Sequence, residues 1–250
     1  TLAGLVLVIG GMMLLFRQRQ KTRRALKRSD ELLLNILPDQ VALELKETGI
    51  SAAKSYESCT VLFADIKDFT KISEQIGALE LVAQMDTYFR AFDQMIMQHG
   101  VEKIKTIGDA YMCAGGLPLS NSTHAQDVVQ VAIEMQKFIK EQDRDNASRF
   151  EFRIGIHTGP LVAGIVGVKK FAYDIWGDTV NTAARMEQSG AAGEINISET
   201  TYELVKNDFE CIARGGIKVK GKGELKMYFV KYTEEAEEKE LLEQEAITMK

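Results

Sequence analysis

The sequence feature that most constrains the fold is residues 101–116, VEKIKTIGDAYMCAGG, which predict a β-hairpin. One apolar run leads into Gly108-Asp109, and a second begins at Tyr111. Two short apolar runs separated by a Gly-containing pair are typical of a hairpin with a tight turn. A tight hairpin joins antiparallel strands, so this chain is not expected to form a purely parallel sheet.

The predicted hairpin carries charged residues at a place suited to chemistry. Asp109 lies in the turn, and Lys103 and Lys105 lie on the strand that leads into it. A loop tip on a rigid hairpin can hold a charged group in a fixed geometry. The alternative is an ordinary surface turn with solvated charges.

A second candidate feature is residues 59–70, CTVLFADIKDFT. The apolar run Cys59 to Ala64 predicts a buried strand, and it ends in Asp65. A carboxylate there is costly unless it is paired or binds a metal. If the two strands are neighbours, Asp65 and Asp109 meet and form an oxygen site that suits Mg²⁺.

Residues 173–186, YDIWGDTVNTAARM, predict a short strand followed by a helix, which Asp178 or Thr179 can cap. Asn181 and Arg185 are four residues apart and so share one face of that helix. An amide and a guanidinium on one face suit a phosphate-bearing substrate. An exposed polar helix face is the alternative.

The rest of the pattern alternates helices and strands. Amphipathic helices are predicted at 71–99 and 124–140, and further strands at 153–158, 194–197, 209–213 and 227–232. Together with the hairpin, this pattern predicts an α+β fold with a βαββαβ core.

The N-terminal region has a different composition. Residues 1–16 carry no charge, and residues 17–28 hold seven basic residues and no acidic one. Sixteen residues are fewer than the roughly 20 that a membrane-spanning helix needs, so we expect 1–16 to be the end of a longer transmembrane helix. The basic juxtamembrane segment then predicts that the following domain is cytoplasmic. A buried core helix is the alternative.

Residues 29–54 show helical spacing interrupted by Pro38, and Ser29 or Asp30 can cap the first piece. This segment is expected to be either a signal-transducing linker helix or a plain spacer. At the other end, residues 233–250 are rich in Glu and predict an acidic C-terminal tail outside the core.

Composition limits the classes of partner. A net charge of −5 gives no support for nucleic-acid binding. The three cysteines show no metal-like or paired spacing, which fits a reducing compartment. His157, in GIHTGP, is interpreted as a structural histidine near a strand end.

Five motifs in order resemble the catalytic domain of class III nucleotidyl cyclases, the adenylyl and guanylyl cyclases. They are FADIKDFT, EKIKTIGDAYM, GIHTGPLVAGIVG, YDIWGDTVNTAARM and VKGKGELKMYFV, and the resemblance covers residues 55–232. It implies a ferredoxin-like core. The N-terminal region makes the chain similar to membrane-anchored, bacterial-type adenylyl cyclases.

The resemblance implies a reaction in which the 3′-hydroxyl of ATP attacks the α-phosphate and expels pyrophosphate, giving 3′,5′-cyclic AMP. Two Mg²⁺ or Mn²⁺ ions per site are expected, held by Asp65, Asp109 and the Ile66 carbonyl. Arg185 is expected to stabilise the charge on the α-phosphate, and Asn181 to orient the ribose.

The same resemblance assigns substrate contacts. Lys220 is expected on the triphosphate, and Phe69 and Thr70 in the loop whose backbone amides face the phosphates. The family usually has Gly where this chain has Asp68. An acidic residue there is unfavourable near a triphosphate unless it faces solvent or meets a lysine.

The pair that reads the base in the family aligns with Lys105 and Asp174. Lys only donates hydrogen bonds, which suits N1 of adenine, and Asp accepts from the adenine 6-amino group. Guanine offers the opposite groups at both positions, so ATP is the expected substrate.

In the family the site lies between two catalytic domains. One chain that carries all of these residues therefore implies a head-to-tail homodimer with two equivalent sites. The alternatives are a guanylyl cyclase, a catalytically silent nucleotide-binding module, and a dinucleotide cyclase. The last usually shows a GG[DE]EF-like hairpin, whereas this hairpin reads TIGDAYM.

Overall fold

The computed structural model describes residues 2–145, 150–167 and 171–232, and these fall into two compact units. The first comprises the described residues within 1–52 and 165–173, and the second comprises the described residues within 53–164 and 174–232. The predicted acidic tail, residues 233–250, lies outside the described residues.

The first unit contains helices α1 (Leu2–Leu34) and α2 (Asp39–Thr48). The break before α2 confirms the predicted interruption at Pro38. The predicted start of a linker helix at Ser29 or Asp30 is wrong, because α1 runs through the basic segment to Leu34. Residues 17–34 contain no Gly or Pro and many strong helix formers, which explains the continuity.

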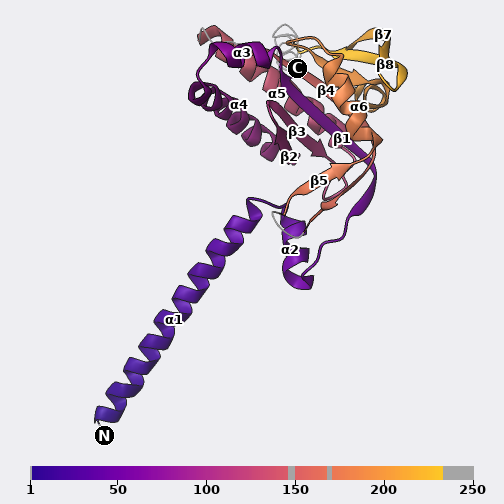
Figure 1. Cartoon of the computed structure of the whole chain (residues 1–250). Helices are drawn as coiled ribbons and strands as arrows, with labels where there is room; N and C mark the ends of the chain where they lie inside the picture. The colour runs from indigo at the N-terminus through magenta and orange to yellow at the C-terminus, as the bar shows by residue number, and fades with distance from the viewer. Residues whose placement is uncertain (1, 146–149, 168–170, 233–250) are drawn as a thin grey trace, which may run out of the picture. The chain divides into compact units, whose positions relative to one another are not determined.

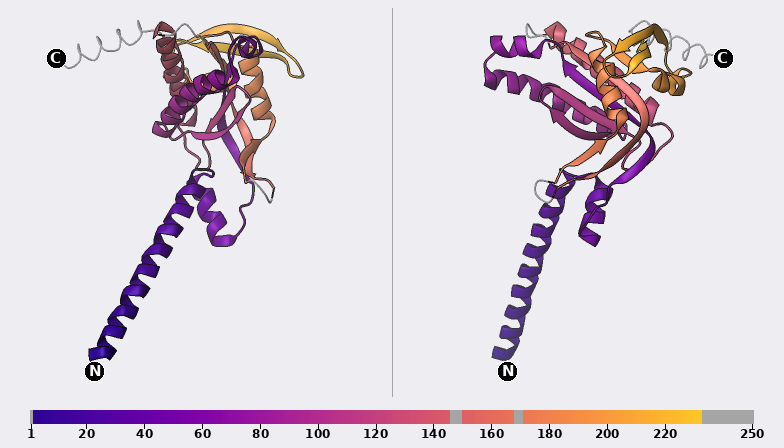
Figure 2. Two further views of the ribbon diagram at one scale, coloured as in Figure 1. Left: turned by 60° about the vertical axis from the view of Figure 1, so that its left-hand side comes forward. Right: turned by 45° about the vertical axis from the view of Figure 1, so that its right-hand side comes forward.

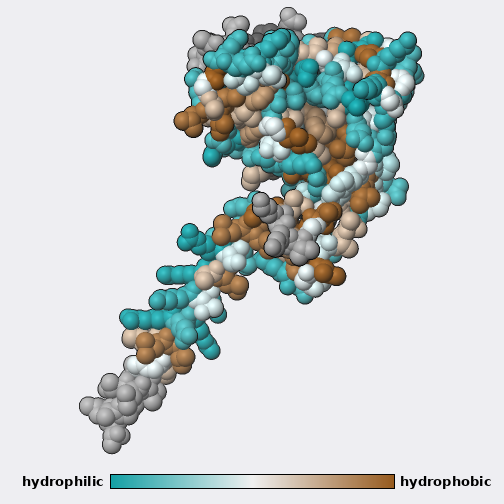
Figure 3. All heavy atoms as spheres, in the orientation of Figure 1, coloured by the Kyte–Doolittle hydropathy of each residue, from teal (hydrophilic) through white to brown (hydrophobic). Residues whose placement is uncertain are grey.

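Hydrophilic side chains extend along α1 beyond the hydrophobic stretch near its start (Figure 3). In the described part of the chain, no helix combines the length and the apolar character needed to cross a membrane. The expected membrane attachment through residues 1–16 stays a prediction without structural support.

The second unit is built on a mostly antiparallel sheet with helices packed against it (Figures 1 and 2). The strand order is β2-β3-β1-β4-β6-β8-β7, and β5 pairs with β4 outside this path. The strands are β1 (Lys54–Ile66), β2 (Glu102–Ile107), β3 (Ala110–Gly115), β4 (Phe152–Ile165), β5 (Tyr173–Trp176), β6 (Ile195–Ser198), β7 (Cys211–Val219) and β8 (Gly223–Val230). The order β2-β3-β1-β4 is that of a βαββαβ core, which confirms the predicted α+β fold.

The helices of this unit are α3 (Phe69–Gln75), α4 (Ala78–Gln98), α5 (His124–Asp145), α6 (Asp178–Gln188) and α7 (Glu199–Val205). The single helix predicted over 71–99 is wrong, because Ile76 and Gly77 are extended and separate α3 from α4. Glycine has a low helix propensity, and here it allows the chain to turn. The predicted inward faces of α4 and α5 are confirmed, since their apolar residues lie in or against the main core.

The two faces of the sheet have different partners. Leu62, Ala64 and Ile66 of β1, and Ile154 and Ile156 of β4, belong to the core that α4 and α5 cover. Side chains alternate along a strand, so Asp65, Arg153 and position 155 lie on the opposite face. There a Cβ at Gly155 would lie 1.9 Å from the backbone nitrogen of Glu187, which shows that α6 packs directly on that face.

Candidate active site

The structure brings Asp65 and Asp109 together. The register pairs Ala64 of β1 with Tyr111 of β3, so Asp65 lies next to the turn that carries Asp109. Gly108 has φ +63°, the positive value that a two-residue hairpin turn needs. The turn therefore projects Asp109 beside the end of β1, as the hairpin prediction required.

The electrostatics of the pair fit a cation. Burial raises the pKa of Asp65, the Asp109 carboxylate raises this pKa further, and Arg153 opposes the shift. Burial also raises the pKa of Asp109, while a hydrogen bond from the backbone of Ile66 acts in the opposite direction. Two neighbouring, partly buried carboxylates, whose charged forms burial disfavours, gain from a shared divalent cation.

Arg153 and Glu187 join this site, and neither was predicted from sequence. Arg153 lies directly opposite Asp65 in the β1–β4 register. Its Nη2 donates to Asp65 Oδ1 over 3.2 Å, and its Nε donates to Glu187 Oε1 over 2.7 Å. Burial, followed by the charge of Asp65, raises the pKa of Glu187 to about 7. Arg153 lies two residues before the motif GIHTGPLVAGIVG, and Glu187 directly follows the motif YDIWGDTVNTAARM. This closeness to the quoted motifs is the sequence signal that could have found them.

The donor set fits Mg²⁺ or Mn²⁺. It consists of the Asp65 and Asp109 carboxylates and the Ile66 carbonyl, all hard oxygen ligands. Within the described residues, no group of three or more His, Cys, Asp or Glu side chains is arranged to hold a metal ion. Two carboxylates are the number with which Mg²⁺ is commonly held when substrate phosphates complete its coordination.

Lys105 of β2 and Asp174 of β5, the predicted base-reading residues, meet in one chain. The Nζ of Lys105 donates to Asp174 Oδ2 over 2.5 Å. The second oxygen of Asp174 accepts from the backbone N–H of Ile175 over 2.9 Å, which fixes the carboxylate plane. Side-chain exposures of 41% for Lys105 and 19% for Asp174 leave the pair open to a ligand.

Helix α6 presents two different faces. Asn181 is exposed, and Arg185 Nη1 donates to Gln188 Oε1 over 2.5 Å. Glu187 follows Arg185 by two residues, which is about 200° around a helix, and it is buried. Because Glu187 points to Arg153 and Asp65, the face with Asn181 and Arg185 points away from the aspartates of its own chain. The predicted caps are wrong: Gly177 is the N-cap, and the Thr179 hydroxyl donates to the Pro160 carbonyl.

The loop before α3 explains the departure at Asp68. Asp68 has φ 55° and is the only non-glycine residue with positive φ among those described. Glycine adopts this region without strain, which accounts physically for the usual family residue. Asp68 is exposed and pairs with Lys71 over 3.1 Å, and this contact lowers the pKa of Asp68. Phe69 and Thr70 begin α3 directly after it.

The basic segment 218–222 is the tip of the hairpin formed by β7 and β8. Lys218 lies in β7, Lys220 is exposed in the turn, and Lys222 donates to Asp178 at the start of α6.

His157 lies near this hairpin tip, with its Nδ1 2.7 Å from Ser198 Oγ. Burial lowers the pKa of His157 to about 4, so this side chain is neutral near pH 7. The interpretation of His157 as a satisfied structural residue agrees with these contacts.

Residues 51–232 match the family described as the adenylate and guanylate cyclase catalytic domain. This chain belongs to the class III nucleotidyl cyclase family.

Relatives with both activities match this cyclase domain. The chain is 40% identical over 204 residues to an adenylate cyclase of Mycobacterium bovis, covering 81% of this chain and 46% of the relative. It is also 40% identical over 218 residues to guanylate cyclase soluble subunit beta-2 of the rat, covering 86% of this chain and 32% of the relative. The chain thus spans less than half of the length of these relatives, and their equal identities favour neither base.

A solved structure supports the fold of the cyclase domain. The adenylyl cyclase CyaB from P. aeruginosa superposes with a TM-score of 0.69 at 32% identity, covering 73% of this chain and 97% of that one.

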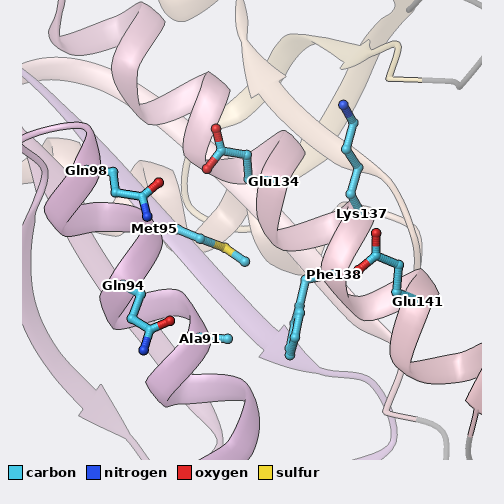
Figure 4. A pocket seen from close by; sticks show the side chains of 8 residues that line it. All are labelled: Ala91, Gln94, Met95, Gln98, Glu134, Lys137, Phe138 and Glu141. Atoms are coloured by element: carbon cyan, nitrogen blue, oxygen red, sulfur yellow. The ribbon is translucent and has the colours of Figure 1, made fainter.

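A pocket of the cyclase domain lies elsewhere. It has a volume of about 350 Å³ and lies between α4 and α5, where Met95 and Phe138 point toward the gap between the helices (Figure 4). None of the predicted site residues lines it.

Proposed function

We propose that this chain is an adenylyl cyclase that converts ATP to 3′,5′-cyclic AMP and pyrophosphate. The observation that carries the proposal is the Lys105–Asp174 pair, which offers a donor and an acceptor side by side at an accessible position. Adenine presents an acceptor at N1 and a donor at its 6-amino group, so both side chains find partners. Guanine presents a donor and an acceptor instead, and both side chains lose theirs.

The metal-binding half of the proposed site consists of Asp65, Asp109 and the Ile66 carbonyl. Bound Mg²⁺ or Mn²⁺ would supply Lewis-acid activation of the 3′-hydroxyl and neutralise the triphosphate and the leaving group. The raised pKa values of both aspartates are the electrostatic support for this assignment.

The other half consists of Asn181 and Arg185 on α6, with Lys220 on the hairpin tip. Arg185 offers a fork of donors to the α-phosphate oxygens, and Asn181 orients the ribose. Lys220 binds the triphosphate as a point charge, and the loop at Phe69 and Thr70 binds it through backbone N–H groups. The bond from the 3′ oxygen to the α-phosphorus forms as the bond to pyrophosphate breaks, and the hydroxyl proton is released to solvent.

A head-to-tail homodimer completes the site. The α6 face with Asn181 and Arg185 is directed away from Asp65 of its own chain, because Glu187, on the opposite side of the helix, is buried against the sheet. Those residues therefore serve the aspartates of a second chain, and a symmetric pair of chains forms two equivalent sites. The class III family acts through such dimers.

The cellular placement is also proposed. Cys59, Cys113 and Cys211 are free thiols, which fits a catalytic domain in the reducing cytoplasm, where ATP is available. Attachment to a membrane through residues 1–16 is a separate proposal that rests on the basic segment after them.

The first test is product formation by the 250-residue chain at several protein concentrations, with ATP or GTP and with Mg²⁺ or Mn²⁺. Cyclic AMP from ATP, with specific activity that rises with concentration, is the expected result. Cyclic GMP would make the chain a guanylyl cyclase, for which the match to the rat guanylate cyclase is the favouring observation. Bound nucleotide without product would favour a silent module.

The second test separates the two halves of the site. An Asp65→Ala chain and an Arg185→Ala chain are each expected to be inactive alone. Mixed, they form heterodimers in which one site has both defects and the other has none. Activity restored toward half of the wild-type value per heterodimer is expected, and no restoration would contradict the shared site.

A further inference from the structure

The hairpin of β7 and β8 packs against α6 through apolar residues of its strands. A small cluster joins the helix to the hairpin, and it consists of Met186 with Val219, Met227, Ile217 and Leu225. The last pair of the hairpin register is Val219 with Gly223, so the turn at 220–222 lies beyond most of these contacts. The apolar cluster therefore holds the body of the hairpin, and the tip needs a contact of its own.

A polar contact joins the hairpin tip to α6. The Nζ of Lys222 donates to Asp178 Oδ1 at the start of the helix, and the side chain of Lys222 is only 22% exposed. The hydrogen bond from Lys222 is the main cause that lowers the pKa of Asp178. Lys220, two residues earlier in the same turn, is exposed. One lysine of the turn thus attaches the tip to α6, and the other faces solvent.

Asp178 stands on a fixed part of the molecule. The buried hydroxyl of its neighbour Thr179 donates to the Pro160 carbonyl of β4 over 2.6 Å. A Cβ at Gly159 would lie 2.6 Å from the Thr179 oxygen, so the strand and the start of α6 are in close contact. A contact with Asp178 therefore fixes the hairpin tip relative to the sheet as well as to the helix.

The same face of α6 carries Asp178 and the proposed substrate residues. Arg185 follows Asp178 by seven residues, about 20° short of two helix turns, and Asn181 follows it by three. The pairing with Lys222 places the hairpin tip, with Lys220, beside this face. It also compensates a carboxylate that would otherwise repel a triphosphate there.

We propose that Asp178 and Lys222 are positioning residues that hold the hairpin tip so that Lys220 meets the triphosphate bound at Asn181 and Arg185. Neither residue of the pair contacts the nucleotide, and both act through Lys220. Asp178 is 77% exposed, and an ion pair with an exposed partner contributes little to folding stability, so its role is to orient the tip. The inference rests on the proposed function, which assigns the three substrate contacts to one half-site.

The first experiment removes both partners in the 250-residue chain and measures KM and kcat for ATP. Asp178→Ala combined with Lys222→Met leaves the net charge unchanged, so a change in KM comes from the position of the tip. KM is expected to rise about 3- to 10-fold with kcat within about twofold, because Lys220 loses the triphosphate in the ground and transition states alike. An unchanged KM would overturn the proposal.

A matched control removes a different pair of charges from the same hairpin. Lys218 and Glu224 oppose each other in the β7–β8 register. Lys218→Met combined with Glu224→Gln also leaves the net charge unchanged, and KM should stay within about twofold of wild type. Lys222→Arg, which keeps a cationic donor for Asp178, should likewise keep the wild-type KM.

A second cycle asks whether the pair acts through Lys220. In a Lys220→Met chain, removal of Asp178 and Lys222 is expected to raise KM by less than about twofold, because the lysine that they position is already absent. The same factor with and without Lys220 would mean that the pair acts on the nucleotide independently of that lysine, and would overturn the proposal.

Hydrogen–deuterium exchange tests the hold on the tip without nucleotide. The backbone N–H of residue 222 donates to the Val219 carbonyl over 3.1 Å. Removal of Asp178 and Lys222 is expected to speed exchange of the amides at 217–225 by about fivefold or more, while the unfolding temperature changes by about 2 °C or less. Unchanged exchange would overturn the proposal.

The outcomes distinguish this inference from the proposed function. If the chain forms no cyclic nucleotide, the proposed function fails, while the exchange measurement still tests the contact between Asp178 and Lys222. If the chain converts GTP, the same KM comparisons are made with GTP. If the chain converts ATP and the variant without the pair keeps the wild-type KM, this inference fails and the proposed function stands.

Discussion

Lys105 and Asp174 are 69 residues apart in sequence, and they form an ion pair of 2.5 Å at the proposed base pocket. Each satisfies the other in the structure, and each keeps a hydrogen-bonding direction that adenine can use. The pair is thus organised before a nucleotide binds, which reduces the entropy lost on binding.

Changing this pair is expected to change the base preference. Lys105→Glu combined with Asp174→Cys should lower the ratio of kcat/KM for ATP over GTP by at least about 10²-fold, because the donor and the acceptor that match adenine are then lost. Lys103→Met is the control, since Lys103 pairs with Asp93 over 2.6 Å instead. An unchanged ratio in the double variant would mean that the base is read elsewhere.

Removal of either aspartate is expected to abolish turnover without unfolding the chain. Asp65→Ala and Asp109→Ala should each lower kcat by about 10³-fold or more, because one ligand of the metal pair is lost. Circular dichroism and thermal unfolding check the fold, and cyclic nucleotide formation checks the rate. Wild-type turnover in either variant would contradict the metal assignment.

Asp68→Gly is expected to be stabilising. Asp68 has φ 55°, where a side chain is strained and glycine is not, and the gain should be about 1 kcal/mol or less. The KM for ATP should also fall, since a carboxylate leaves the phosphate loop. Lys71→Met is the complementary change: it leaves Asp68 unpaired, so a higher KM is expected. A KM that rises in Asp68→Gly would argue that this loop does not face phosphate.

Gly155→Ala is expected to displace α6. The new Cβ would collide with the backbone of Glu187 at 1.9 Å, and backbone cannot rotate away. A loss of about 1–3 kcal/mol in unfolding free energy is expected, together with reduced kcat. Gly77→Ser serves as control, because no atom lies within 4 Å of a Cβ there. Equal stability of the two variants would show that α6 adjusts freely.

The stability of the cyclase domain is expected to fall in mild acid. His157 has a folded pKa of about 4 because of burial, against an ordinary value of 6.5, so the unfolded chain binds the proton more tightly. Its contribution is complete above pH 6.5 and is lost as the pH falls toward 4, by up to about 3 kcal/mol. His157→Asn, which can keep the Ser198 contact, should make the free energy of unfolding, measured with urea, depend less on pH between these two pH values. An unchanged pH slope would contradict this.

Much of the fold was predictable because its signals are local. The hairpin at Gly108, the buried strand ending at Asp65 and the apolar faces of α4 and α5 each follow from a short stretch of sequence. Where local signals were weak, prediction failed: Gly77 separates α3 from α4, and nothing interrupts α1 at Ser29.

The sequence by itself determined the residue types of the site, their order and the family to which they belong. Only the tertiary structure decided which of them meet. Arg153 stands opposite Asp65 because of strand register, and Glu187 reaches Arg153 because Gly155 lets α6 lie on the sheet. Register and backbone approach depend on packing across the whole sheet, so no local pattern encodes them.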